Sequence, residues 1–174
     1  MIKVIAFDLV GVLVTERDVN LTKEQAKLES LFDAYNDEVD NVANLLKIDD
    51  IKKATLDIFN KLYEIQYPDL FKQIKQKYKK VRIVIASNHV SYIKDYLEEK
   101  FKPDEIYLSS LIGLAKPNKD YFLYLLSKEG INPDEMLFID DKELNIINSS
   151  ELGIKTIKVN KETKLLEEIK KHMI

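Results

Sequence analysis

The sequence predicts an α/β protein with a three-layer, Rossmann-like α/β/α core, a parallel five-stranded sheet and a small helical cap. Short β-branched runs alternate with helical patterns through the second half of the chain, and such strict alternation is typical of a parallel sheet covered on both faces. One more apolar run opens the chain, ahead of a long stretch with no convincing strand. The 174 residues suffice for one main domain with a small appended unit.

Five apolar runs are predicted as strands because they are short and rich in β-branched residues. They comprise residues 2–7, 81–86, 106–108, 136–139 and 154–159. Helices are expected between and after them, over about 68–78, 91–100, 118–127 and 142–152, and from about 161 onward. Pro68 suits the start of the first helix, whereas Gly130 and Gly153 are expected to follow the ends of the third and fourth. The α/β core is therefore assigned to residues 1–14 and 68–174.

Residues 15–67 are predicted to be helical and to form the cap. Apolar residues recur at three- and four-residue spacing from Leu28 to Leu46 and again from Ile51 to Ile65, as on the buried face of a helix. Asp49 or Asp50 can cap the second of these helices. The stretch is too long for a single crossover between parallel strands, so part of it should stand over the crevice at the sheet edge.

Composition argues against several classes of function. The net charge of −3 lacks the basic excess that binding to a phosphate backbone needs, so no nucleic-acid partner is expected. The chain has no cysteine, which excludes disulfides and thiolate metal sites. The first apolar run meets Asp8 too early for a signal peptide or a membrane span. We therefore expect a cytoplasmic protein without a membrane partner.

Polar side chains stand at the ends of three of the predicted strands. Asp8 follows the first, Ser87 the second, and Asp140 and Asp141 the fourth. The carboxyl ends of parallel strands share one edge of a sheet, so these side chains should meet in a single crevice. Carboxylates gathered in one place repel each other unless a cation or a shared proton offsets the repulsion. The pattern therefore indicates a metal-dependent active site.

Each element also has a plainer interpretation. Asp8, close to Gly11, suits a nucleophile that approaches an electrophile, but an aspartate after a strand also caps turns. Ser87 and Asn88 can bind an anion with a hydroxyl and backbone N–H groups, or can serve as an ordinary N-cap. Lys116 can neutralise charge in the crevice, or can simply lie on the surface.

The adjacent Asp140 and Asp141 form the sharpest local signal. Mg²⁺ prefers hard oxygen ligands, commonly one or two carboxylates together with substrate phosphate. The alternative is that both residues cap the helix that follows, but one aspartate suffices for that role. Mg²⁺ is accordingly the expected cofactor.

Four segments in a fixed order carry a resemblance to a known family: residues 7–13, 85–88, 113–117 and 138–141, with Asn145 and Gly153 downstream. The chain resembles the haloacid dehalogenase-like (HAD) hydrolase superfamily, of the type with a small helical cap inserted after the first motif. The resemblance covers the core, residues 1–14 and 68–160. The cap would be short for this group.

The resemblance implies a role for each motif. Asp8 would attack phosphorus and form an aspartyl-phosphate, Ser87 with Asn88 beside it would bind the phosphoryl group, and Lys116 would hold both nucleophile and phosphate. The ligands of Mg²⁺ would be the carboxylates of Asp8, Asp140 and Asp141 and the backbone carbonyl of Val10. The implied partner is a small phosphorylated substrate.

Val10 departs from the family pattern, because most phosphatases of the family have a second aspartate there. That aspartate protonates the leaving group and later activates water, and positioned acid–base catalysis contributes roughly 10²–10⁴-fold. Valine cannot transfer a proton. Turnover is therefore expected to be slow, to be limited to good leaving groups, or to use another group; His89 at the crevice mouth, Glu16 and Asp18 are the candidates.

Three functions remain open at this point. The first is a Mg²⁺-dependent phosphatase of small phosphorylated metabolites that acts through Asp8. The second is a pseudoenzyme that keeps the metal and phosphate site but turns over little. The third is hydrolytic dehalogenation without a metal, which the mutual repulsion of Asp140 and Asp141 disfavours. A monomer and a homodimer are both compatible with the sequence.

Overall fold

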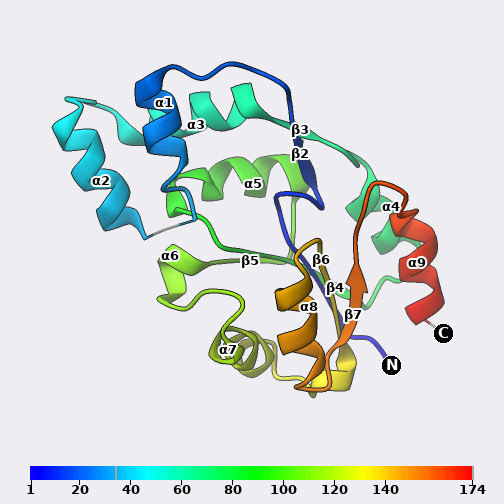
Figure 1. Cartoon of the computed structure of the whole chain (residues 1–174). Helices are drawn as coiled ribbons and strands as arrows, with labels where there is room; N and C mark the ends of the chain where they lie inside the picture. Colours follow the sequence, from blue (N-terminus) through cyan, green and yellow to red (C-terminus); the bar gives the residue numbers. More distant parts are fainter. Residues whose placement is uncertain (34, 174) are drawn as a thin grey trace.

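The computed structural model describes residues 1–33 and 35–173; Ala34 in the expected cap and Ile174 at the end of the expected core lie outside the described residues. At the centre is a sheet of five parallel strands in the order β5-β4-β1-β6-β7, with helices on both faces (Figure 1). The strands are β1 (Val4–Phe7), β4 (Arg82–Ser87), β5 (Glu105–Leu108), β6 (Met136–Asp140) and β7 (Lys155–Lys158). The predicted three-layer α/β fold is confirmed.

Alternation along the strands explains the layers, because successive side chains of a strand point to opposite faces. In β1, Ile5 and Phe7 pack in the apolar core of one face, and Val4 and Ala6 pack in that of the other. The helices of the first face are α4 (Leu70–Lys77), α5 (Lys94–Phe101) and α9 (Leu165–His172). Those of the second face are α7 (Lys119–Glu129) and α8 (Glu143–Ser150). Short turns of helix join these elements at η1 (Ser91–Ile93), α6 (Ser109–Ile112) and η2 (Pro133–Glu135).

Three helices lie between β1 and α4 in the chain: α1 (Lys23–Glu29), α2 (Asn36–Leu45) and α3 (Ile51–Leu62). Figure 1 shows them grouped together, away from α7 and α8. They share an apolar cluster of their own, in which Val90 from the loop after β4 also packs. Asp50 is the residue that caps α3, since its carboxylate accepts the backbone N–H of Lys53 at 2.9 Å.

Two predictions for this stretch are wrong. The sequence predicts no strand over residues 15–79, yet β2 (Val14–Glu16) and β3 (Tyr63–Ile65) form an antiparallel pair. Each has only three residues, too few for an alternating pattern, and Ile65 also fits the helical spacing of α3. The helical pattern from Leu28 to Leu46 is also divided, because α1 ends at Glu29 and α2 begins at Asn36.

Hydrogen bonds tie the three helices to the loop that follows β4. The backbone N–H of Val90 donates to the carbonyl of Phe32 at 2.9 Å. The amide of Asn36 donates to Ser91 Oγ at 2.6 Å and accepts the Ser91 N–H at 3.0 Å. The helices therefore cover the carboxyl end of β4. No helix in the described part of the chain is both long and apolar enough to cross a bilayer.

Candidate active site

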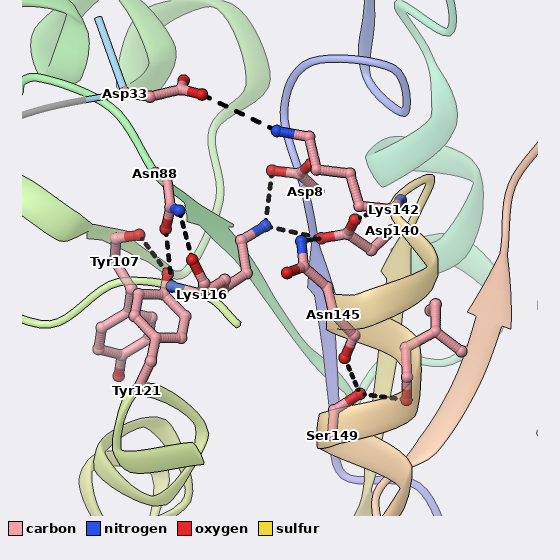
Figure 2. Close-up of polar contacts among 11 residues, drawn as sticks. Asp8, Asp33, Asn88, Tyr107, Lys116, Tyr121, Asp140, Lys142, Asn145 and Ser149 are labelled. Carbon is pink, nitrogen blue, oxygen red and sulfur yellow. Dashed lines mark hydrogen bonds and ion pairs between the residues drawn. The ribbon is translucent and has the colours of Figure 1, made fainter. Parts of the chain in front are cut away.

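Lys116 joins two carboxylates at the carboxyl edge of the sheet. Its Nζ lies 2.8 Å from Asp8 Oδ1 and 2.7 Å from Asp140 Oδ2, and all three side chains are buried (Figure 2). Asp8 follows β1 and Asp140 ends β6, and the parallel pairing of these neighbouring strands sets the two carboxylates side by side. Lys116 approaches from the loop before α7. Three of the predicted site residues therefore meet.

Burial and charge act against each other on these groups. Burial is the main cause that raises the pKa of Asp8 to about 6; the positive charge of Lys116 opposes the rise and the negative charge of Asp140 adds to it. Burial lowers the pKa of Lys116, but the charges of Asp8 and Asp140 outweigh burial, so the pKa is raised. Lys116 is therefore cationic at neutral pH. Asp8 is ionised at that pH, and its buried charge lowers the stability of the folded protein.

Asp140 has a donor on each of its oxygens. Oδ1 accepts the backbone N–H of Lys142 at 2.8 Å, and Oδ2 accepts the Asn145 side-chain amide at 2.9 Å in addition to Lys116. In Figure 2 the Asn145 side chain points from α8 toward this carboxylate. These donors fix the orientation of the Asp140 carboxylate. Its negative charge is thereby held next to the ammonium group of Lys116.

Asp141 has the properties expected of a cation ligand. One oxygen from each of Asp8, Asp140 and Asp141 lies within 4.8 Å of the others. Asp141 Oδ1 is buried and has no hydrogen-bond partner in the described part of the chain. Burial and then the charge of Asp140 raise the pKa of Asp141. A hard divalent cation would give Asp141 Oδ1 a partner and would offset the repulsion between the carboxylates. The residues present therefore fit Mg²⁺.

Gly11 makes room for the Asp141 carboxylate. Its φ of 84° lies in the left-handed region that favours glycine. A Cβ on Gly11 would stand 2.5 Å from Asp141 Oδ2 and 2.6 Å from Asp141 Cγ, well inside van der Waals contact. A side chain at this position therefore cannot coexist with the observed Asp141 carboxylate.

Gly11→Ala is expected to weaken binding of Mg²⁺ by about tenfold or more, because the methyl group displaces a carboxylate that fits the ion. The backbone strain should also lower the free energy of unfolding by about 1–3 kcal/mol. Gly130→Ala is the matched control, since Gly130 has φ 63° and a Cβ there would meet no heavy atom within 4 Å. Calorimetric titration with MgCl₂ and urea denaturation measure the two effects. Equal Mg²⁺ affinity in the two variants would contradict the role assigned to Gly11.

Ser87 ends β4 beside these groups, and Asn88 directly follows it. Ser87 is buried and lines the same cavity as Asp8. The Asn88 side chain holds the loop of Lys116: Nδ2 donates to the Lys116 carbonyl at 2.7 Å, and Oδ1 accepts the Lys116 N–H at 2.9 Å. Asn88 thus positions Lys116, a role that its sequence context did not indicate. Its backbone N–H is left as the group for the predicted contact with substrate.

His89 is buried, and the prediction that it stands at the crevice mouth is wrong. The side chain is 1% exposed, and its ring centroid lies 5.2 Å from that of Phe32 and 5.8 Å from that of Phe59. Burial lowers the pKa of His89 to about 4, so the imidazole is neutral at pH 7 and is a poor source of a proton. Phe59 comes from α3 and Phe32 from the turn after α1, and a local pattern cannot show such distant contacts.

The buried neutral state of His89 should make stability depend on pH. The unfolded chain binds a proton on His89 below about pH 6.5, whereas the folded protein does so only near pH 4, so stability is lost as pH falls through this window. From pH 7 to pH 5 the free energy of unfolding should fall by about 2 kcal/mol more in the wild-type protein than in His89→Gln. Urea denaturation at both pH values measures the difference. The same loss in both proteins would show that His89 is not the group responsible.

Two adjoining cavities open at the site. The smaller, of about 20 Å³, has room for about one water-sized group and is lined in part by the predicted residues Asp8, Val10, Ser87, Asn88 and Lys116. The larger, of about 300 Å³, shares Val10, Asp33 and Lys142 with it and also includes Asp141. The predicted residues are thus gathered in one place.

Lys142 and Asp33 are among the residues of these cavities that were not identified from the sequence. Lys142 Nζ lies 3.8 Å from Asp33 Oδ2 across the opening (Figure 2). A signal for Lys142 exists, because it directly follows the acidic pair Asp140 and Asp141. None exists for Asp33, which reaches the site from the segment between α1 and α2. Of the proposed replacements for the missing aspartate, Glu16 and His89 line the larger cavity, and Asp18 is not among its wall residues.

Comparison with known proteins identifies one family whose model matches most of this chain. A family model described as haloacid dehalogenase-like hydrolase matches residues 14–159. D-ribitol-5-phosphate phosphatase from Bacteroides thetaiotaomicron is 26% identical over 121 residues, which are 64% of this chain and 57% of that protein. Acyl-CoA dehydrogenase family member 10 from Mus musculus is 29% identical over 98 residues, 56% of this chain and 9% of that protein. The matches therefore span less than two thirds of either relative.

Solved structures share the fold over nearly the whole chain. A predicted HAD-like family hydrolase from Porphyromonas gingivalis superposes with a TM-score of 0.75 and 22% identity, covering 99% of this chain and 98% of that one. A HAD family enzyme from Bacteroides thetaiotaomicron, in complex with magnesium and inorganic phosphate, has a TM-score of 0.74 and 21% identity, covering 95% and 98%. At such identities the likeness establishes the fold alone.

Proposed function

Because the chain belongs to the haloacid dehalogenase-like hydrolase family, we propose that it is a Mg²⁺-dependent phosphatase of small phosphorylated metabolites, with Asp8 as nucleophile. The observation that carries this proposal is the buried carboxylate of Asp8, held at 2.8 Å by Lys116. A paired, buried carboxylate beside a cavity is suited to covalent catalysis.

In the proposed reaction the Asp8 carboxylate attacks phosphorus while the P–O bond to the leaving group breaks, and the leaving oxygen takes a proton from water to become an alcohol. Water then attacks the aspartyl-phosphate, releases inorganic phosphate and restores the carboxylate. Lys116 neutralises charge on the nucleophile and on the phosphoryl group, and Ser87 with the backbone N–H of Asn88 binds phosphoryl oxygens. The shared cavity lined by Asp8, Ser87, Asn88 and Lys116 supports these roles.

Mg²⁺ is the proposed cofactor, held by Asp8, Asp140, Asp141 and the backbone carbonyl of Val10. When bound, the ion neutralises phosphate charge and orients the ester for attack. The proposal is supported by the buried, unpartnered oxygen of Asp141 in the described part of the chain. It is also supported by the related Bacteroides enzyme in complex with magnesium and inorganic phosphate.

Residues 15–67 are proposed to act as the cap over this site, and residues 1–14 and 68–174 as the catalytic core. The tie between Val90 and Phe32 supports this division, because it holds the helices against the loop that bears Ser87 and Asn88. A relative is a D-ribitol-5-phosphate phosphatase, so a phosphorylated polyol is a candidate substrate. The cytoplasmic location and the absence of a nucleic-acid partner stay predictions of the sequence.

Val10 favours a second candidate function, a phosphate- and metal-binding pseudoenzyme. Val10 lines both cavities, and its side chain offers no proton where the family resemblance implies an acid. Metal-free dehalogenation is less well supported, because Asp140 and Asp141 would stand together without a cation.

Release of inorganic phosphate from small phosphomonoesters separates these candidates. With MgCl₂ present the phosphatase should release phosphate, and chelation by EDTA should lower the rate by about 100-fold or more. Restoring MgCl₂ should restore the rate. Mg²⁺ and phosphate binding without turnover would favour the pseudoenzyme, whereas hydrolysis that survives EDTA would favour metal-free chemistry.

A further inference from the structure

The larger cavity, which adjoins the smaller one that Asp8 lines, has an acidic wall. Glu16 from β2, Glu29 from α1, Asp33 and Asp141 line it, and Asp33 also lines the smaller cavity. Lys142 is the one basic residue of this wall in the described part of the chain, and it lies 3.8 Å from Asp33. Carboxylates therefore outnumber cations in the lining of the larger cavity.

These carboxylates act on a common space. The pKa of Tyr63, whose side chain also lines the cavity, is raised by burial and then by the charges of Glu29, Glu16 and Asp33. The pKa of Glu29 is raised by burial and then by the charges of Glu16 and Asp33. The three charges therefore repel one another, and a cationic ligand among them would remove that repulsion.

His89 supplies an independent observation in the same wall. Its Nε2 is buried and has no hydrogen-bond partner in the described part of the chain. Its Nδ1 lies 3.2 Å from the Val90 carbonyl, which only accepts, so Nδ1 carries the proton of the neutral ring. Nε2 is then an acceptor. His89 therefore adds a buried acceptor without a partner in the described part of the chain to the lining of the same cavity.

A second metal ion does not suit this wall. Among residues 1–33 and 35–173, the only group of three acidic or imidazole ligands close enough to share an ion is Asp8, Asp140 and Asp141. The acidic residues of the larger cavity instead line a space of about 300 Å³, at the lower end of the range for small-molecule sites. Phe32 and Tyr63 add aromatic surface, which also attracts organic cations.

We propose that this cavity binds the leaving-group half of the substrate and selects a leaving group that carries a protonated amine, as in the phosphate ester of a small amino alcohol. The proposal rests on the phosphatase function proposed above, and it adds that the leaving group of the substrate carries a positive charge. In the reaction the ester P–O bond breaks, the oxygen of water ends on phosphate, and the amino alcohol leaves with a proton on its hydroxyl. An ester with a carboxylate in its leaving group would be rejected by the same wall.

Two esters of equal length test the proposal: 2-aminoethyl phosphate and 2-hydroxyethyl phosphate. The ratio of their kcat/KM values in the wild-type protein should favour the amine by about fivefold or more. In Glu29→Gln the ratio should fall by about threefold, because one carboxylate of the wall is neutralised. Comparing variants cancels the intrinsic reactivity of the two esters. Glu38→Gln is the control: Glu38 is exposed on α2 and outside the cavity, so the ratio should stay unchanged.

Binding gives a second readout that needs no turnover. In Asp8→Asn, calorimetric titration with the two esters should show tighter binding of the ester that carries the amine. In Asp8→Asn/Glu29→Gln this preference should fall by about the same factor as the kcat/KM ratio. A ratio at or below one, or a ratio unaffected by Glu29→Gln, would overturn the proposal while leaving a phosphatase intact. Failure of every ester, p-nitrophenyl phosphate included, to release phosphate would overturn the proposed function, and the substrate class would fall with it.

Discussion

Asp8→Asn is expected to lower Mg²⁺-dependent phosphate release by about 10³-fold or more while leaving the protein at least as stable as the wild type. Activity is lost because the amide cannot attack phosphorus. Stability is kept because the pKa of Asp8 is raised to about 6, chiefly by burial, so its ionisation at pH 7 disfavours the folded state. Asn removes that buried charge, and Lys116 retains Asp140 as a partner at 2.7 Å.

Phosphate release and urea denaturation, both at pH 7, measure the two effects on the same preparations. A variant that is inactive and as stable as the wild type fits a carboxylate kept for chemistry rather than for folding. Unchanged phosphate release in Asp8→Asn would remove Asp8 from the mechanism. An inactive variant with a large loss of stability would instead point to a structural role for the ion pair with Lys116.

Val10→Asp is expected to raise turnover of esters with poor leaving groups by about 10²–10⁴-fold, because it supplies the proton transfer that valine cannot. The new carboxyl group would enter a cavity already lined by Glu16, Glu29 and Asp33, and neighbouring negative charge favours the protonated form that a general acid needs. The gain should be smaller for p-nitrophenyl phosphate in the first step, since its leaving group needs little protonation.

Val10→Asn separates proton transfer from polarity. Asparagine has nearly the size of aspartate and keeps the backbone carbonyl at this position, but it cannot transfer a proton. Steady-state rates for both variants against an alkyl phosphate and p-nitrophenyl phosphate measure the effect. A gain in Val10→Asp alone supports the account of Val10. Equal rates in both variants and the wild type would show that another group already performs the transfer.

The layers of the fold were predictable because the strands are buried on both faces and therefore appear as unbroken apolar runs. The meeting of Asp8 and Asp140 was predictable for a related reason. Each directly ends or follows such a run, and parallel strands bring these ends to one edge. The polar site residues could be identified because they lie at the ends of apolar runs, and the sequence shows where those runs end.

Other features depend on contacts between distant segments, which local patterns do not record. The burial of His89 comes from Phe32 and Phe59, more than one element away in the chain. Asp33 reaches the cavity only because the three helices fold back over the loop after β4. The short β2 and β3 are held by their pairing with each other rather than by a pattern of their own.

The pairing of β1 with β6 has a consequence for how such a protein can diversify. Phe7 lies opposite Ile139, and the Asp8 N–H donates to the Ile139 carbonyl at 2.8 Å, so the backbone ladder fixes the gap between the two carboxylates that follow. No mutation of a surrounding side chain readily alters that gap, since interstrand spacing is nearly constant. Substitutions in α1–α3 are therefore expected to change the walls of the larger cavity without changing the separation of Asp8 and Asp140.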